Sequence, residues 1–214
     1  MGKSRRSAER LVEMARSAAL PVARTLLTPA LRGWVKEVLN ARRVQKNPGR
    51  IPLVNQILPA YAALGGRILW VGCRLYTKEY PALLERHGGE CWTTDIAITH
   101  AKWGAAGRHL TWDLLQIDQL LAPESFDSVL CNGVFGFGVN TRDAQSAALR
   151  AMAGILKPEG RLLLGWNTDR VADPLQIDFV DHAFTADDLT GRGARISLPE
   201  AGYVYDFLRR RKES

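Results

Sequence analysis

Polar residues and a glycine end or follow four segments that we predict as strands, at the positions where α/β proteins bind their ligands. Gly72 opens the turn after the first segment, Asp95 ends the second, Asp113 follows the third and Asn132 ends the fourth. The carboxyl ends of parallel strands meet at one edge of a sheet, and ligands bind there where the strand order reverses. We therefore expect these four residues to line one ligand site.

The turn that begins at Gly72 reads GCRLYT and carries no further glycine. A dinucleotide pyrophosphate needs close backbone approach and exposed amides, which the side chains of Arg74 and Tyr76 would crowd. The turn therefore argues against NAD, NADP and FAD. The sequence also lacks the G-x-x-x-x-G-K-[ST] loop that cradles nucleotide phosphates.

Asp95 and Asp113 each have a ligand-binding and a structural interpretation. A carboxylate at Asp95 can accept hydrogen bonds from both hydroxyls of a ribose, as an adenosine ligand requires. Asp113 can accept a hydrogen bond from the exocyclic amine of adenine. Either aspartate can instead cap the turn or helix that follows it, and for Asp113 that helix would begin at Leu114.

Strands separated by helices predict an α/β fold, a Rossmann-like parallel sheet with helices on both faces. A helix is expected at Arg142–Leu156, followed by a turn at Lys157–Gly160. A terminal antiparallel hairpin is expected from two further strands, Arg195–Leu198 and Tyr203–Leu208. The five strands of the parallel part are expected at Ile68–Val71, Glu90–Ile96, Arg108–Trp112, Phe126–Asn132 and Arg161–Trp166.

The N-terminal part differs from the rest in charge. The net charge of the 214 residues is +7, and residues 1–50 contain twelve Lys or Arg against three Glu. Apolar periodicity predicts helices at 7–20, 22–39 and 53–64. We expect a basic helical extension at 1–60 and a Rossmann-like domain at 61–214.

The composition is that of an ordinary globular protein, with 46% hydrophobic and 24% charged residues. No apolar run approaches the roughly 20 residues that cross a bilayer, and the N-terminus makes a poor secretory signal, so a cytoplasmic location is expected. The three cysteines lack metal-ligand spacing and are interpreted as small buried side chains, so no metal site is predicted.

Five segments in series resemble the successive motifs of the class I methyltransferases. They read RILWVGCRLYT, ECWTTDI, HLTWDLL, FDSVLCNGVFGFGVN and LKPEGRLLLGWN, and they cover roughly residues 65–167. The resemblance implies a seven-stranded sheet whose last strand is antiparallel, with S-adenosylmethionine as the cofactor.

The same resemblance implies roles for individual residues. Asp95 would bind the ribose, Asp113 would lie near the adenine, and Asn132 and Gly133 would flank the methionine portion. The full cofactor-binding set that we predict is Gly72, Cys73, Arg74, Tyr76, Asp95, Ile96, Asp113, Leu114, Asn132 and Gly133.

The chain departs from the family pattern in the turn after the first strand. Trp70 stands where the family has an acidic residue, and Arg74 and Tyr76 stand among positions that are usually glycine. Arg74 can pair with the carboxylate of the cofactor while Tyr76 packs beside it. Alternatively, both side chains fill the pocket and abolish cofactor binding.

Methyl transfer requires alignment of the acceptor with the methyl group, helped by a general base when the acceptor is a hydroxyl. His182 is the predicted base, with Asp169, Asp178 and Asp181 as alternatives, although a lone histidine can also be structural. Acceptor contacts are predicted from aromatic and polar residues that follow the fourth and fifth strands, Phe135, Phe137, Trp166 and Asn167.

Two functions follow from these residues. The first is methylation of oxygen or nitrogen on a small-molecule or glycan acceptor, and the second is a catalytically inactive relative that acts as a binding or scaffolding partner. The basic extension can pack on the domain, on a second copy or on a partner chain, or contact an anionic membrane surface. Nucleic acid is disfavoured, because Trp34 is the only aromatic residue among residues 1–50.

Overall fold

The computed structural model describes residues 28–212 and divides the chain into two compact units, residues up to Lys46 and residues from Asn47 onward. This division falls before the boundary that we expected at residue 60. In the first unit, helix α3 (Pro29–Gln45) begins after Thr28, whose hydroxyl accepts a hydrogen bond from the Leu31 amide at 3.3 Å. The expected helix at 22–39 overlaps α3, and the expected helix at 7–20 lies outside the described residues.

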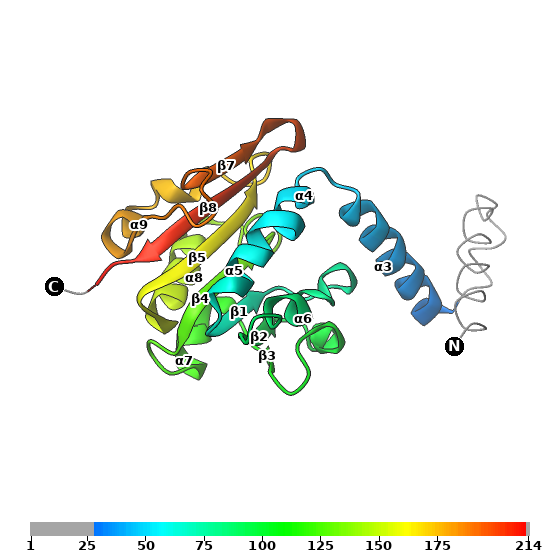
Figure 1. Cartoon of the computed structure of the whole chain (residues 1–214). Helices are drawn as coiled ribbons and strands as arrows, with labels where there is room; N and C mark the ends of the chain where they lie inside the picture. The colour runs from blue at the N-terminus through cyan, green and yellow to red at the C-terminus, as the bar shows by residue number, and fades with distance from the viewer. Residues whose placement is uncertain (1–27, 213–214) are drawn as a thin grey trace. The chain divides into compact units, whose positions relative to one another are not determined.

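The second unit contains one mixed sheet of eight strands with the order β3-β2-β1-β4-β5-β8-β6, and β7 pairs beside β6 along β8 (Figure 1). Strands β1 to β5 run parallel, and β8 runs antiparallel to its neighbours. The predicted parallel sheet and terminal hairpin are thus confirmed. The strands are β1 (Arg67–Val71), β2 (Glu90–Asp95), β3 (His109–Thr111), β4 (Phe126–Asn132), β5 (Leu156–Asn167), β6 (Phe184–Ala186), β7 (Arg195–Leu198) and β8 (Tyr203–Arg210).

Two details of the sheet differ from the expectation. The fifth strand begins at Leu156 and includes residues 157–160, where we expected a turn. These residues interrupt the pairing register with β4, since Leu156 pairs with Phe126 and Arg161 pairs with Ser128. The sheet also has one strand more than the seven that the resemblance implied. The extra strand arises because β6 pairs with one half of β8 and β7 with the other half.

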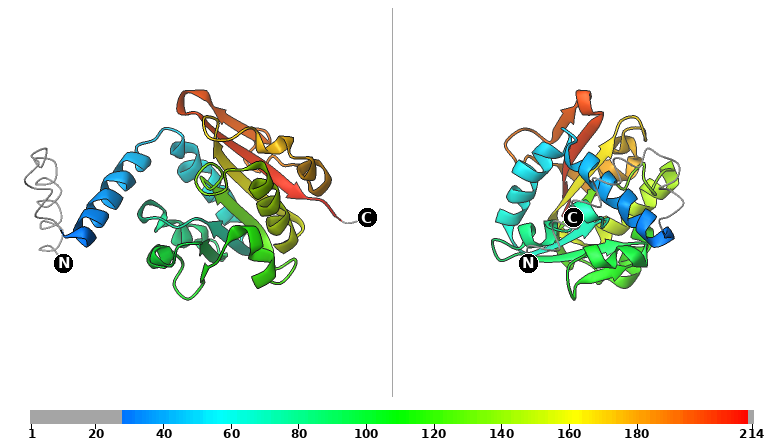
Figure 2. Two further views of the ribbon diagram at one scale, coloured as in Figure 1. Left: turned by 180° about the vertical axis from the view of Figure 1, so that it is seen from behind. Right: turned by 90° about the vertical axis from the view of Figure 1, so that its right-hand side faces the viewer.

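Alternate residues of β1 face opposite sides of the sheet and belong to two separate cores. Leu69 and Val71 pack into the core under helices α7 (Ile117–Leu120), α8 (Arg142–Ile155) and α9 (Asp178–Ala183). Ile68 and Trp70 pack on the other face, with the π-helical turn η1 (Leu53–Ile57) and helices α5 (Leu58–Leu64) and α6 (Tyr80–Leu84). Figure 2 shows α8 covering the face that lies behind the sheet in Figure 1. Both faces of the parallel part are therefore buried, as parallel sheets require.

The remaining helices are short, with one or two turns each, and most of them lie at the carboxyl ends of the strands. They are α4 (Arg50–Pro52) and the 3-10 turns η2 (Leu75–Thr77), η3 (Ile98–Trp103), η4 (Leu114–Gln116), η5 (Pro174–Gln176) and η6 (Pro199–Ala201). The turns η2, η3 and η4 follow β1, β2 and β3 and build one edge of the sheet. Among the described residues, no helix combines the length and the apolar character that a membrane span needs.

Candidate active site

The strand order reverses between β1 and β4, so the turns after these two strands lie side by side. The backbone there adopts positive φ angles at Gly72 (+87°) and Gly133 (+68°), which side chains other than glycine rarely accept. The Gly72 amide donates to the Thr94 carbonyl and the Gly133 amide to the Gly165 carbonyl, both at 2.8 Å. These bonds fix the two turns at the carboxyl edge of the sheet, where open α/β sheets bind ligands.

Asp95 lies at the end of β2 with only 5% of its side chain exposed, and its carboxylate has four partners. Oδ2 accepts from the Cys73 amide and from Nη1 of Arg74, both at 2.8 Å. Oδ1 accepts from the Ala97 amide and contacts Nδ1 of His100, both at 2.9 Å. Burial raises the pKa of Asp95, but these donors and the Arg74 charge outweigh burial and hold the pKa below its usual value. Asp95 is an ionised group whose accepting positions are filled from within the chain.

The Arg74 side chain points back over its own turn. Its Nη1 atom lies 2.8 Å from the Cys73 carbonyl, 2.8 Å from Asp95 Oδ2 and 2.5 Å from His100 Nδ1. The His100 nitrogen donates to Asp95 only when it carries a hydrogen, and it accepts from Arg74 only when it does not. His100 therefore supports Asp95 or Arg74, but not both at once.

Asp113 caps η4, because its Oδ1 accepts a hydrogen bond from the Leu115 amide at 3.0 Å. This is the structural interpretation that we had left open, and the half-buried carboxylate still lies at the carboxyl edge beside β3. Leu114 points into the core at 6% exposure, whereas Ile96 is 70% exposed beside Asp95. Cys73 is buried, and its pKa is raised by that burial to about 12.

Asn132 and Gly133, at the end of β4, meet Tyr203 at the start of β8. The Tyr203 hydroxyl donates to Asn132 Oδ1 at 2.8 Å. The side chain of Asn132 passes so close to β5 that a Cβ atom at Gly165 would lie 2.1 Å from Oδ1, so a larger residue at 165 would displace the Asn132 side chain. Tyr203 was not predicted from the sequence, because nothing in the order of residues shows that an antiparallel last strand starts beside β4 and β5.

Arg50 is a second residue that the sequence did not place at the site. Its guanidinium lies over the ring of Tyr76, 4.7 Å from the centroid, and 5.5 Å from the ring centroid of Tyr80. It also donates a hydrogen bond to the Tyr80 hydroxyl. We had counted Arg50 with the basic extension, whereas the structure assigns it to the unit that contains the sheet.

Two of the four predicted acceptor residues do not line the edge. Phe135 is fully buried, and Trp166 is 4% exposed and donates from its indole nitrogen to Asp206 at 2.8 Å. Both pack in the core, because their turn and strand direct the rings inward. Phe137 is 54% exposed with the Arg170 guanidinium 4.9 Å from its ring centroid, and half-buried Asn167 pairs with Tyr203 at the end of β5.

His182 lies at the opposite edge of the sheet. It is exposed on α9, just before β6, and β6 pairs with the end of β8 that lies beside the start of β5. Its Nδ1 donates to the Asp178 carbonyl at 2.7 Å. The structure therefore does not bring His182 to Gly72 and Asp95. The alternatives Asp178 and Asp181 are on the same helix, and Asp169 is an exposed partner of Arg170.

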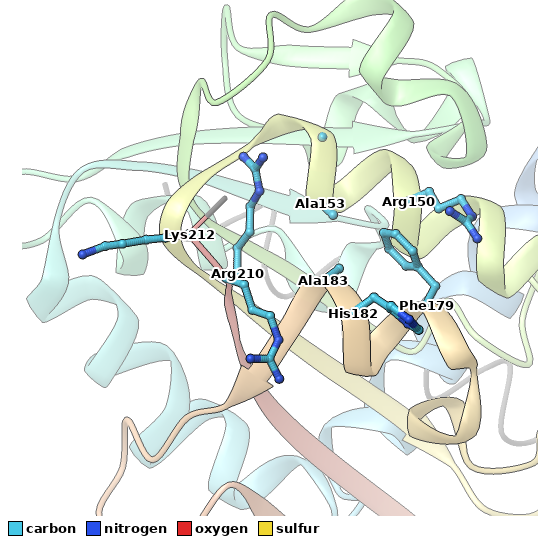
Figure 3. Close-up of a pocket in the computed structure, with 9 residues that line it drawn as sticks. Arg150, Ala153, Phe179, His182, Ala183, Arg210 and Lys212 are labelled. Atoms are coloured by element: carbon cyan, nitrogen blue, oxygen red, sulfur yellow. The ribbon is translucent and has the colours of Figure 1, made fainter. Parts of the chain in front are cut away.

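A basic hollow of about 630 Å³ surrounds His182 (Figure 3). The hollow forms where α8 and α9 carry small residues, and cationic side chains line it. Figure 3 shows Phe179 beside Arg150, with Lys212 directed away from both. The lining residues are Arg150, Ala153, Gly154, Phe179, His182, Ala183, Arg210, Arg211 and Lys212.

Within residues 28–212, no group of three or more His, Cys, Asp or Glu side chains is arranged to hold a metal ion. Cys73, Cys91 and Cys131 are all buried and unpaired. The chemistry of the carboxyl edge therefore rests on Asp95, Asp113, Asn132 and the arginines and tyrosines around them.

Comparison with known proteins gives a domain match over part of the chain and a shared fold. Residues 69–164 match the family model described as a methyltransferase domain. No curated protein matches the sequence. The matched residues run from β1 to β5 and include Gly72, Asp95, Asp113 and Asn132.

Three similar solved structures share the fold at low sequence identity. The N-methyltransferase NodS from Bradyrhizobium japonicum WM9, in complex with S-adenosylhomocysteine, has a TM-score of 0.60 and 17% identity over 79% of this chain and 91% of its own. A 1,6-didemethyltoxoflavin-N1-methyltransferase from Burkholderia thailandensis has a TM-score of 0.52 and 19% identity over 87% and 92%. A TehB-like methyltransferase from Corynebacterium glutamicum has a TM-score of 0.56 and 16% identity over 81% and 99%. With the strand order and the site at the reversal point, the chain shares the fold of these solved methyltransferases, and its residues 69–164 are similar to a methyltransferase domain.

Proposed function

We propose that this chain binds S-adenosylmethionine at the carboxyl edge of the sheet and transfers the methyl group to a small-molecule or glycan acceptor. One observation carries the proposal, which is the ionised Asp95 at the end of β2, next to the positive-φ turn at Gly72. A carboxylate in this position can accept hydrogen bonds from the two ribose hydroxyls of the cofactor.

The residues of this edge fit the cofactor on one condition. Gly72 and Gly133 keep the backbone conformation of their turns, and half-buried Asp113 remains beside β3 for the adenine. The accepting positions of Asp95 are filled, however, and the amides of Cys73 and Ala97 can stay in place. Arg74 and His100 must therefore release the carboxylate before two hydroxyls can bind to it.

When bound, the cofactor supplies a methyl group on a positively charged sulfur. The chain's own residues hold the acceptor in line with that group and exclude water. Among the described residues of this edge, Asp95 is ionised but engaged, and burial raises the pKa of Tyr203 above its usual value, so neither is a good base near neutral pH. An uncharged amine needs no deprotonation before it attacks, and we therefore favour nitrogen over oxygen as the acceptor atom. Exposed Phe137, after β4, is the aromatic contact that we propose for the acceptor.

The ion pair between Arg74 and Asp95 favours a second function. If the cofactor cannot displace Arg74, the fold persists without methyl transfer, and the chain acts as a binding or scaffolding partner of another protein. The two functions differ in one measurable property, which is cofactor binding by the folded protein.

Calorimetric titration with S-adenosylmethionine and S-adenosylhomocysteine tests the proposal. We expect micromolar binding by the wild-type protein, weakened about tenfold or more in Asp95→Ala. Asp118→Ala, which removes an exposed carboxylate from α7, is the matched control and should bind as the wild type does. Equal binding by Asp95→Ala would place the cofactor elsewhere. No binding by folded wild-type protein would refute the enzyme and support the partner function.

A further inference from the structure

Arg50 is a half-buried cation with no anionic partner in the described part of the chain. Its contacts are two tyrosine rings and the Tyr80 hydroxyl, and it forms none of the ion pairs among residues 28–212. A guanidinium offers several N–H donors in a planar fork, and the Tyr80 hydroxyl uses one of its nitrogens. A cation removed from water without a counter-charge is unfavourable, so an anion of matching shape would improve this arrangement.

The backbone holds Arg50 in this place. The Tyr205 hydroxyl donates to the Gly49 carbonyl at 2.8 Å, which joins the start of α4 to β8. A Cβ atom at Gly49 would lie 3.3 Å from Cβ of Tyr203, so a larger residue would push α4 away from the strand. The position of Arg50 is thus determined by packing against the last strand, and not by its own side chain.

This position is next to the proposed methyl-transfer site. Tyr76, under the guanidinium, belongs to the turn that follows Gly72. Tyr203, whose hydroxyl bonds to Asn132, packs against the neighbouring residue Gly49. Burial raises the pKa of Tyr203, and the Arg50 charge acts in the opposite direction. Arg50 therefore stands between the turns after β1 and β4, at the end of the site remote from the adenine-side residue Asp113.

We propose that Arg50 binds a carboxylate at this edge of the sheet, and that this is the carboxylate of the cofactor's amino acid portion. The inference rests on the proposed cofactor site. Arg74 was the expected partner of that carboxylate, but its guanidinium is turned to Asp95, at the ribose end. Arg50 has the right charge and a planar fork of donors, and its hydrogen bond to a described residue, from Nη2 to the Tyr80 hydroxyl, does not use all of these donors.

The test compares two nucleosides that differ in the carboxylate. S-adenosylhomocysteine carries the amino acid portion, and 5′-methylthioadenosine has the same thioether without it. In calorimetry, we expect Arg50→Gln to weaken S-adenosylhomocysteine by about ten- to thirtyfold and to change 5′-methylthioadenosine by less than about twofold. Arg50→Lys, which keeps the charge but loses the fork, should fall between them. Arg192→Gln, which removes an exposed arginine bonded to Gln56, is the matched control and should bind both ligands normally.

A second arm uses small carboxylates as probes. Acetate and succinate are added to the wild type and to Arg50→Gln, each saturated with S-adenosylhomocysteine, and the shift in Tm is recorded. If acetate or succinate raises the Tm of the wild type but not of Arg50→Gln, while the variant binds both nucleosides normally, Arg50 binds a carboxylate of the acceptor. That result overturns its assignment to the cofactor. Equal loss of both nucleosides, or no difference in either arm, overturns the role of Arg50 and leaves the cofactor site intact. If folded wild-type protein binds neither nucleoside, the proposed function fails, and the succinate shift measured without nucleoside decides the Arg50 site by itself.

Discussion

Replacing Arg74 by alanine should tighten cofactor binding. In the cofactor site that we propose, the ribose hydroxyls would compete with Arg74 for Oδ2 of Asp95, which Arg74 holds at 2.8 Å. A charge-assisted hydrogen bond contributes about 1.5–3 kcal/mol, and an exposed ion pair about 0.2–1 kcal/mol. Because 40% of the Arg74 side chain is exposed and only 5% of the Asp95 side chain is, we take about 1–2 kcal/mol, between the two ranges. Since this interaction is lost when the cofactor binds, its removal should raise affinity by about five- to thirtyfold.

The same free energy should be lost from the stability of the protein without cofactor. Urea unfolding of Arg74→Ala should therefore show a decrease of about 1–2 kcal/mol, and saturation with S-adenosylhomocysteine should remove most of the difference from the wild type. Calorimetry measures the affinity and denaturation measures the stability. Weaker binding by Arg74→Ala would show that Arg74 contacts the cofactor. If Arg74→Ala bound the cofactor with unchanged affinity but was less stable, the ion pair between Arg74 and Asp95 would be intact in the wild-type complex. Asp95 would then not bind the ribose. His100→Ala, which removes the other side chain from Asp95, is the matched comparison.

Three further predictions concern the rest of the domain. Gly72→Ala should cost about 1–2 kcal/mol in urea unfolding, because the backbone there has a φ of +87°. Arg195 donates to Asp173 and holds its pKa below 3.8, so this carboxylate stabilises the fold above pH 3.8 and loses that effect as the pH falls through the lowered value. The stability difference between wild type and Asp173→Asn should accordingly be largest near neutral pH and vanish in strong acid. The three cysteines should resist a thiol reagent at pH 8 until denaturant is added, since burial raises each thiol pKa to about 12.

The regular part of the fold could be predicted because its signals are local. The segments that became β1 and β4 are short, mostly apolar and followed by turn residues, as is typical of buried parallel strands, whereas β2 contains only Cys91 and Trp92 as apolar residues. The terminal hairpin was predictable from the short connection 199–202. The irregularity in β5 was not, because Pro158 and Gly160 mark a turn in any isolated segment, and only pairing with β4 carries the strand across it.

The site was predictable only where it depends on the order of strands. Asp95 and Asn132 follow from the rule that parallel strands end at one edge, and the sequence alone places them. Arg50 and Tyr203 come from a turn before the first strand and from the start of the last one, and long-range packing brings them there. His182 lies away from this edge for the converse reason. Its position after β5 indicated the active edge, but α9 carries the chain back to the amino end of the sheet before β6 begins.

The turn after β1 carries two large side chains, Arg74 and Tyr76, at positions where a glycine-rich turn has none. Glycines in such a turn leave room above it and expose amides. Here the two large side chains leave the turn in different directions, Arg74 to Asp95 and Tyr76 to Arg50. Each therefore has a partner that a bound cofactor would contact, and neither packs into the core. The turn is thus occupied by side chains of the chain itself. Cofactor binding would require Asp95 to exchange Arg74 for the ribose hydroxyls. In that case the free energy of the Arg74 contact, and not the absence of glycines, decides whether the chain has the methyltransferase activity that we propose.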